Sequence, residues 1–314
     1  MAIMKLEPSV KDYVWGGRRL IDEYGKKAPG DTIAETWELS CYPGSESVIV
    51  NGEYAGKTLA EYISISGGKV LGKNITDPEH FPILVKFIDA KEDLSIQVHP
   101  DDEYAREHGH YYGKSEMWYI IDAAEDAVLC HGLNRKITKK EFKQRINDGT
   151  LMEVLNRVPV KKGDVFFIGA GTIHSIGKGI LLAEVQQNSN ITYRVFDYKR
   201  KDNNGKEREL HIKEALDVAR LEPEGERYQG VFSSFDCAYF TVDRKNTIES
   251  TDDGIHVKVG KDSFKHLLVT RGSGKIKNGD EEMEISKGDS LFLPASSGDH
   301  RITGRFEVLI TYVG

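Results

Sequence analysis

Cysteine is scarce in this chain. Cys41, Cys130 and Cys237 are far apart, and no CxxC pair occurs. This argues against a disulfide framework and against a cysteine zinc site. No apolar run approaches the roughly eighteen residues of a membrane span, and the N-terminus lacks the apolar core of a signal peptide. Together these absences predict a cytoplasmic protein with no membrane partner.

Long runs of lysine and arginine are also missing. The formal net charge is −7 and the pI is about 5.9, so nucleic acid is not expected as a partner. An anionic ligand would therefore need a local basic pocket. With 314 residues, 39% of them hydrophobic, the chain can bury a large core, and two packed modules are expected rather than one.

The stretch from 94 to 102, Leu-Ser-Ile-Gln-Val-His-Pro-Asp-Asp, has the alternation of a β-strand. Gln97 and His99 then point to the same side. Pro100 cannot donate to a ladder and ends the strand, and Asp101 is placed to cap a short helix. Two donor side chains thus lie at a strand end.

Two further strands carry matching donors. Residues 115–121 place Glu116 in an otherwise apolar run, where a carboxylate needs a counter-charge. Residues 162–175 read as a strand, a glycine turn and then His174. Imidazole, carboxylate and amide oxygen suit a divalent ion, with Zn²⁺ first and Fe, Mn or Co as alternatives.

Three motifs make the chain resemble a short bacterial type I mannose-6-phosphate isomerase, a member of the cupin superfamily. They are Ser-Ile-Gln-Val-His-Pro at 95–100, Gly-Lys-Ser-Glu-Met-Trp-Tyr at 113–119 and Glu-Val-Gln-Gln-Asn-Ser-Asn-Ile-Thr-Tyr-Arg-Val-Phe-Asp-Tyr at 184–198. The resemblance implies one Zn²⁺ per chain, bound by four residues: Gln97, His99, Glu116 and His174.

The resemblance also implies a phosphosugar substrate, with contacts from five residues: Trp15, Glu35, Lys86, Ser95 and Tyr193. Lys86 interrupts the apolar strand at 81–89 and must reach water or an anion. By the resemblance it faces the substrate phosphate together with Ser95 on the neighbouring strand. Arg200, or Lys199 beside it, is expected to close over the phosphate, although such basic clusters are usually solvated.

The reaction implied is aldose–ketose isomerisation, in which a proton moves between C2 and C1 through an enediol. Lys114 lies two residues before Glu116, so both are expected on one strand face. Arg194 stays protonated, and its planar guanidinium can donate paired hydrogen bonds to the enediolate or the phosphate. We assign Arg194, Lys114 and Glu184 as catalytic. The base is left open between Lys114, Glu184 and a metal-bound water.

Two functions from other classes compete with this interpretation: a metal-dependent cupin oxygenase and a non-catalytic sugar-binding cupin. Oxygenase cupins generally carry His where this chain has Gln97. The tyrosine-flanked pair His108 and His110 is interpreted as a solvated loop rather than a metal site. The glycines after Arg271 lack the spacing of a phosphate loop and are interpreted as a hairpin turn.

The fold is predicted to be mainly β, with two cupin-type jelly-roll barrels or sandwiches and short helical insertions. Helix-capping boxes are predicted at Thr58/Glu61, Thr138/Glu141 and Thr150/Glu153, the last two within a helical insertion at about 135–158. A further helix is expected at 211–220. The protein is expected as a monomer or homodimer.

The polar stretch 221–227 is the expected boundary between a catalytic domain at 1–225 and a degenerate domain at 226–314. Lys-Gly-Asp at 287–289, followed by His300, repeats the pattern of 162–174 with one extra residue. His266 stands where Glu116 stands in the first copy. The second copy has no preceding Gln-x-His, so we expect it to bind no metal.

Overall fold

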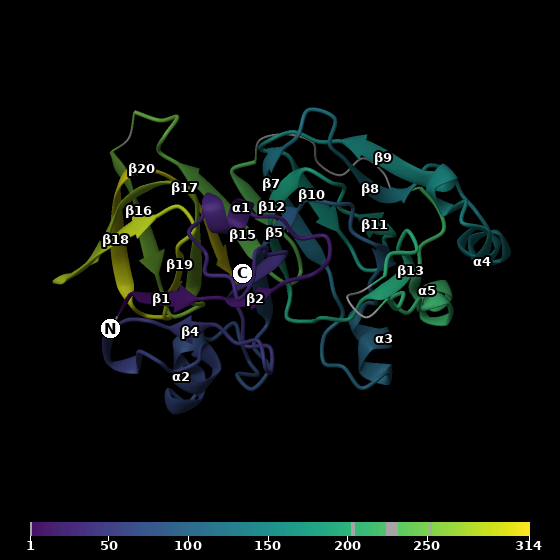
Figure 1. Cartoon of the computed structure of the whole chain (residues 1–314). Coiled ribbons are helices and arrows are strands. Elements are labelled where there is room, and N and C mark those ends of the chain that lie inside the picture. The colour runs from purple at the N-terminus through teal and green to yellow at the C-terminus, as the bar shows by residue number, and fades with distance from the viewer. Residues whose placement is uncertain (1, 202–204, 224–231, 252) are drawn as a thin grey trace.

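The computed structural model describes residues 2–201, 205–223, 232–251 and 253–314. These residues form twenty strands in sheets of nine, six and five, together with five short α-helices. The prediction of a mainly β fold is confirmed. The sheets pack as layers (Figure 1), and their strand orders run from edge to edge, so they are sandwiches rather than closed barrels.

The six-stranded sheet is the middle layer. Its order is β10 (Val165–Ile168), β7 (Glu116–Ala123), β12 (Ile180–Gln187), β5 (Ile83–Ala90), β3 (Glu35–Leu39) and β2 (Ser9–Lys11). Successive residues of β5 enter different cores, Phe87 on one face and Ile88 on the other. Burial on both faces explains why this strand reads as a nearly continuous apolar run.

The five-stranded sheet covers one face of that layer. Its order is β13 (Tyr193–Phe196), β6 (Ile96–Val98), β11 (His174–Ser175), β8 (Val128–Leu133) and β9 (Leu155–Pro159). Leu129 from this sheet shares a core with Ile88, Trp118 and Phe166 of the middle layer. The two sheets therefore form one sandwich, and the predicted metal ligands lie in it.

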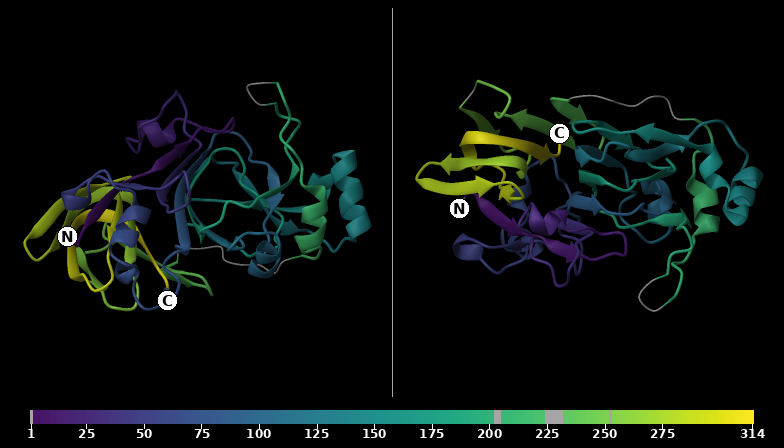
Figure 2. Two further views of the ribbon diagram at one scale, coloured as in Figure 1. Left: turned by 90° about the horizontal axis from the view of Figure 1, so that it is seen from below. Right: turned by 45° about the horizontal axis from the view of Figure 1, so that its top comes forward.

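The nine-stranded sheet covers the opposite face of the middle layer. It comprises β1 (Met4–Glu7), β4 (Val48–Ile49), β14 (Ser234–Asp236), β15 (Thr241–Asn246), β16 (Gly254–Val259), β17 (Lys265–Asn278), β18 (Glu281–Ser286), β19 (Ser290–Leu293) and β20 (Gly298–Tyr312). Figure 2 shows the C-terminal strands and the teal strands as two lobes, with the N-terminal segment between them.

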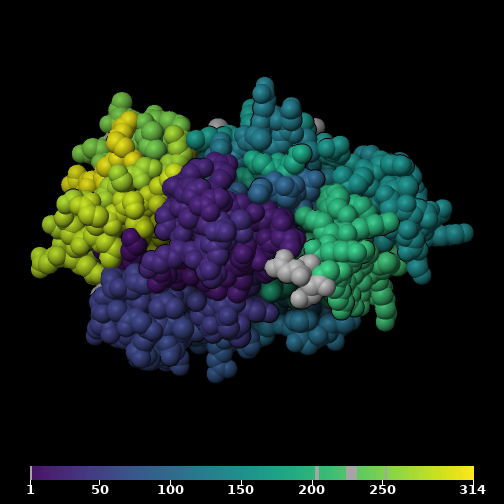
Figure 3. Space-filling model, viewed as in Figure 1, coloured from purple at the N-terminus to yellow at the C-terminus, as the bar shows by residue number. Residues whose placement is uncertain are grey.

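The N-terminal segment belongs partly to the C-terminal sheet. Met4 on β1 pairs with Phe292 on β19, and Leu6 pairs with Ile49 on β4. In Figure 3 the same segment, in purple, lies across the middle of the visible face between the two ends of the molecule. The predicted division at 225 falls within residues 224–231, outside the described residues, and stays a prediction.

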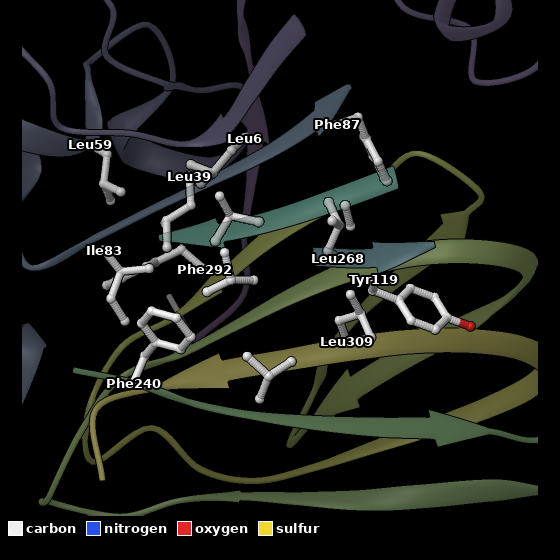
Figure 4. Close-up of a cluster of buried hydrophobic side chains, with 14 of the residues drawn as sticks. Leu6, Leu39, Leu59, Ile83, Phe87, Tyr119, Phe240, Leu268, Phe292 and Leu309 are labelled. Atoms are coloured by element: carbon white, nitrogen blue, oxygen red, sulfur yellow. The ribbon is translucent and has the colours of Figure 1, made fainter. Parts of the chain in front are cut away.

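A hydrophobic core joins the C-terminal sheet to the back of the middle layer (Figure 4). Side chains from both halves of the chain meet there, among them Leu6, Leu39, Leu59, Ile83, Phe87, Tyr119, Phe240, Leu268, Phe292 and Leu309. Each fully buried apolar side chain contributes roughly 1.5–3 kcal/mol. The strands that carry the site are thus supported from behind by the second lobe.

The helices are short and lie outside the sheets. They are α1 (Arg19–Asp22), α2 (Leu59–Ile65), α3 (Asp102–Glu107), α4 (Lys139–Asp148) and α5 (Ile212–Val218), with single 3-10 turns η1 (Gly52–Tyr54), η2 (Lys69–Leu71) and η3 (Leu151–Val154). The capping box at Thr58/Glu61 and the cap by Asp101 are confirmed. No helix of the described residues is long and apolar enough to cross a membrane.

The predicted capping box at Thr150/Glu153 is wrong. Thr150 makes no side-chain cap, and η3 gives way at once to strand β9. Leu151, Val154 and Leu155 have helical spacing, but Leu155 pairs with Leu133 on β8. Sheet pairing outweighs the local pattern here, as tertiary context commonly does.

Candidate active site

The register of the five-stranded sheet brings the predicted metal ligands together. His174 opens β11, and its cross-strand partner on β6 is Gln97. His99 directly follows β6, where Pro100 stops the ladder. Glu116 is the first residue of β7 in the facing sheet. The site therefore lies inside the sandwich, at strand ends from both of its layers.

The donor atoms of His99, Glu116 and His174 all lie within 4.8 Å of one another. Nε2 of His99 is 3.6 Å from Oε2 of Glu116, and Nε2 of His174 is 3.4 Å from Oε1. The amide nitrogen of Gln97 lies 3.3 Å from Nε2 of His174. At most 1% of the surface of each of the three clustered residues is exposed. The structure thus places all four side chains at one point.

Both histidines present a lone pair to this point. Nδ1 of His174 donates to the backbone oxygen of Thr172 at 2.8 Å, which leaves Nε2 free of hydrogen. Burial lowers the pKa of His174 to about 3, and burial followed by the Lys114 charge lowers the pKa of His99 well below its usual value. Neutral imidazoles of this kind are the form that binds metals.

The arrangement fits a metal ion. Ligands bound at about 2.0–2.1 Å in a tetrahedral zinc site are about 3.4 Å apart, close to the 3.4 and 3.6 Å separations measured here. Within the described residues Oε1 of Glu116 has no hydrogen-bond partner, and Oε2 has Nζ of Lys114 at 3.2 Å. Burial, and then the nearby Glu184 carboxylate, raises the pKa of Glu116. A cation at this point would satisfy a buried carboxylate that is otherwise costly.

Lys114 lies beside the same donors. Its Nζ is 3.1 Å from Nε2 of His99 and 3.2 Å from Oε2 of Glu116, and its side chain is buried. The backbone N–H of Lys114 donates to the oxygen of Pro100 and so fixes it next to His99. Since an ammonium can only donate, Nε2 of His99 accepts from it. The spacing of Lys114 and Glu116 therefore predicted their proximity correctly.

A second charged group lies next to this cluster. Nζ of Lys86 is 2.9 Å from Oε1 of Glu184 and 3.6 Å from Oε2 of Glu35. Burial alone would lower the pKa of Lys86, but the two carboxylates outweigh it and raise that pKa. Glu184 also accepts from Nε1 of Trp118 at 2.9 Å, and Glu35 from Nε1 of Trp37 at 2.8 Å. Lys86 is therefore held between two carboxylates.

A pocket of about 330 Å³ opens onto these groups. Eight of the predicted site residues line it: Trp15, Glu35, Lys86, Ser95, Gln97, Lys114, Glu184 and Arg194. His99, Glu116 and His174 are buried. They adjoin two pocket residues, since Lys114 lies next to His99 and Gln97 lies next to His174. Ser95 precedes β6 in the five-stranded sheet, so the expectation that it lies on a strand next to that of Lys86 is wrong. The pocket instead spans both sheets.

Two predicted substrate residues do not line this pocket. The ring of Tyr193 packs edge-on against Tyr104 in a neighbouring core, and burial raises its pKa to about 12. Arg200 lines a different hollow and makes an ion pair with Asp197. Tyr193 also lines a different hollow. Substrate contact by Tyr193 and Arg200 stays a prediction, because neither residue lines the pocket next to the ligand cluster.

Four polar residues that the sequence did not single out also line the pocket: Tyr13, Asn190, Thr192 and Arg208. Asn190 and Thr192 fall inside the motif at 184–198, so their signal was present. Arg208 follows the charged sequence at 199–207 and carries no periodic or motif signal. His108 and His110 are exposed, as expected for a solvated loop.

Comparison with known proteins assigns the family. Residues 3–145 match the model of the type I phosphomannose isomerase catalytic domain, and residues 233–313 match that of the mannose-6-phosphate isomerase cupin domain. Mannose-6-phosphate isomerase ManA of Bacillus subtilis is 38% identical over 98% of both chains.

Solved structures agree with this assignment. The crystal structure of the mannose 6-phosphate isomerase from Bacillus subtilis covers 99% of both chains at 35% identity, with a TM-score of 0.89. A zinc-bound mannose 6-phosphate isomerase shares the fold at 18% identity, with full coverage of both chains and a TM-score of 0.79. The chain therefore belongs to the type I mannose-6-phosphate isomerases.

Proposed function

We propose that this chain interconverts mannose 6-phosphate and fructose 6-phosphate by proton transfer between C2 and C1 of the sugar, with one Zn²⁺ bound. The observation that carries the proposal is the convergence of His99, Glu116 and His174 beside a pocket that two lysines and two arginines line. The names of the full-length relatives support the substrate.

Gln97, His99, Glu116 and His174 would hold the metal. The first of these offers its amide oxygen after a half-turn of the amide group, whose two ends have nearly the same shape. With Zn²⁺ bound by two neutral imidazoles, one neutral amide and one carboxylate, the site would have a net charge near +1. When bound, the ion supplies positive charge that stabilises an oxyanion developing on the substrate. The zinc in a structural relative supports the choice of metal.

Lys114 and Glu184 are the residues we assign to the proton chemistry. Both line the pocket next to the ligand cluster. Burial opposes ionisation of Glu184, but Lys86 and then Lys114 outweigh it and lower its pKa. Glu184 is thus a carboxylate at neutral pH; it accepts the proton from C2 of the sugar and returns it to C1. Lys114, a donor 3.1 Å from His99, donates a proton to O1 as negative charge develops there and takes one back from the O2 hydroxyl.

The remaining pocket residues bind and orient the sugar. Trp15 offers an apolar ring face, and Glu35 and Ser95 offer hydrogen-bonding groups at the pocket wall. Lys86 is fixed by its two carboxylates and holds Glu184 in place. Arg194 supplies a planar cation for the anionic part of the substrate.

The test is a coupled assay from mannose 6-phosphate to fructose 6-phosphate, on the purified protein, after treatment with a chelator, and after zinc is added back. We expect turnover to disappear with the metal and to return with zinc. Full turnover by protein shown to contain no metal would contradict the proposal. Oxygen uptake without isomerisation would favour a cupin oxygenase instead, and sugar affinity without turnover a binding protein.

A further inference from the structure

The pocket carries an excess of positive charge that is unevenly placed. Four lysine and arginine side chains line it against two carboxylates, Glu35 and Glu184, a balance of +2. A phosphate monoester near neutral pH carries a charge of about −1.5 to −2. Both lysines, Lys86 and Lys114, already have carboxylate partners within about 3.2 Å. The unmatched charge therefore lies on the arginine side, where Arg208 shares the carboxylate of Asp197 with Arg200.

Arg194 has donors available for a ligand. Its Nη1 donates to the backbone oxygen of Glu209 at 3.1 Å, whereas its Nε is buried and, within the described residues, has no hydrogen-bond partner. Burial, and then the neighbouring Arg208, lowers the pKa of Arg194. An unsatisfied buried donor and a like-charged neighbour both disfavour the pocket without an anion.

Arg208 is brought to the same pocket by the backbone pairing of residues 209–211 with β13. The backbone N–H of His211 donates to the oxygen of Arg194 at 2.8 Å, and the N–H of Arg194 lies 3.3 Å from Nδ1 of His211. Residues 209–211 are therefore fixed along β13 at Arg194, and Arg208 precedes them. Its side chain reaches the pocket that Arg194 lines.

Asp197 fixes the orientation of Arg208. Nε of Arg208 is 2.6 Å from one carboxylate oxygen of Asp197, and Nη2 is 2.7 Å from the other. Such a bidentate pair holds the plane of the guanidinium. Asp197 is buried and also binds Arg200, whose Nη1 donates to the backbone oxygen of Asp93. Arg200 thus helps to fix the position of Asp197 from outside the pocket.

We propose that Arg194 and Arg208 together bind the phosphate group of the substrate, and that Asp197 is the positioning residue that aims Arg208. The inference rests on the proposed function and makes it more specific. The phosphate then lies at the arginine side of the pocket, and the sugar carbons lie toward Gln97 and Lys114. Lys86, which the family resemblance assigns to the phosphate, acts through Glu184 instead. Arg200, which was expected from its basic cluster to close over the phosphate, acts through Asp197.

The test compares Arg208→Gln with Arg145→Gln. Arg145 is a matched control, because it is also largely buried and paired with carboxylates, Glu141 and Glu153, but on α4 and away from the pocket. We expect Arg208→Gln to raise the KM for mannose 6-phosphate and the inhibition constant of inorganic phosphate by about 10-fold or more, the loss of one charge-assisted contact. We expect Arg145→Gln to leave both within about twofold.

Three measurements separate phosphate binding from general damage. With mannose 6-phosphate, Arg208→Gln should raise the KM by a larger factor than it lowers kcat, because the lost contact is to the phosphate and not to the reacting carbons. Asp197→Asn should weaken phosphate inhibition less than Arg208→Gln, and Asp197→Glu should restore part of it. Calorimetric titration with inorganic phosphate tests the arginine pair even if no isomerase turnover is found. Equal phosphate affinity in Arg208→Gln and the unaltered protein would overturn the inference, as would a loss of kcat at unchanged KM.

Discussion

The chain folds two similar stretches, one in each lobe, into the same local structure. Asp164 and Asp289 each accept a hydrogen bond, 2.9 Å long in both cases, from the backbone N–H three residues earlier. The glycine before each aspartate has φ of 91° or 94°, in the left-handed region that favours glycine. Strands β10 and β19 follow directly. The repeated sequence motif is therefore a repeated turn and strand.

The buried histidines near these strands differ in how they use their nitrogens. His174 donates through Nδ1 to a backbone oxygen and turns Nε2 toward Glu116. Ser290 donates its hydrogen to the oxygen of Glu38 at 2.8 Å, so at 2.9 Å it must accept from Nε2 of His266. One histidine offers a lone pair to a ligand, and the other uses its N–H within the scaffold. The chemistry lies in the donor set and not in the shared fold.

The largest effect is expected from Glu116→Gln, which removes the charge of the ligand cluster without changing its size. Loss of a residue that only supports a metal ligand costs roughly 10- to 100-fold in metal affinity, so loss of the ligand charge should cost more than about 100-fold. We expect the dialysed variant to contain no bound metal by mass spectrometry and to have no measurable turnover.

His266→Gln is the matched control in the other lobe. The register around the shared turn pairs Ile168 with Glu116 but the equivalent Leu293 with Lys265, so His266 matches Met117 and the expected match with Glu116 is wrong. His266→Gln therefore alters a buried histidine outside any ligand position and should keep the full metal content although its stability falls. Loss of metal from His266→Gln, or retention of metal by Glu116→Gln, would remove the distinction between the two lobes.

Each face of the middle layer also has a lysine held against carboxylates, and the next prediction compares these lysines. Lys86 contacts Glu184 and Glu35 in the pocket, whereas Lys26 contacts Glu38 at 2.6 Å next to the C-terminal sheet. Removing one partner of a buried ion pair costs about 3–5 kcal/mol. Lys86→Met and Lys26→Met should therefore each lower the free energy of unfolding in urea by about 3 kcal/mol.

Activity should separate the two variants. Lys86→Met frees Glu184 and should lower kcat/KM for mannose 6-phosphate at unchanged metal content, because no metal ligand is altered. Lys26→Met should keep kcat/KM within about twofold. If both variants lose activity equally, Lys86 acts only through stability.

Part of the metal cluster could be predicted from local rules, whereas its convergence with Glu116 and His174 came from the family resemblance. Strand alternation puts Gln97 and His99 on one face, and the same rule places Lys114 with Glu116. The caps at Thr58 and Asp101 are equally local. In each case the residues that interact lie within a few positions of one another or in one recognisable motif.

The remaining site depended on pairings between distant segments. Arg208 reaches the pocket only because His211 pairs with Arg194, and no local pattern encodes that contact. The glycines after Arg271 were predicted to form a hairpin turn, but they lie inside the long strand β17, next to a bulge between Val269 and Arg271. Partner strands decided both outcomes.

The smallest effect concerns the pH dependence of stability in the C-terminal lobe. Burial, and then the charge of Lys26, lowers the pKa of His266 to about 3. Nδ1 of His266 has no hydrogen-bond partner in the described residues, so a second proton would be buried without an acceptor. In the unfolded chain the same histidine titrates near its ordinary value of about 6.5. Between these two values only the unfolded state binds the proton, so stability falls as pH decreases.

Lowering the pH from 7 to 5 should therefore reduce the free energy of unfolding by about 2 kcal/mol through His266 alone. The glutamine introduced by His266→Gln cannot take up a proton, while its amide can still donate to Ser290. We therefore expect the loss of stability between pH 7 and pH 5, measured by urea denaturation, to be smaller by about 2 kcal/mol in His266→Gln. His110→Gln, which alters an exposed side chain, is the control and should follow the unaltered protein. An unchanged pH dependence in His266→Gln would show that His266 is not held neutral in the folded chain.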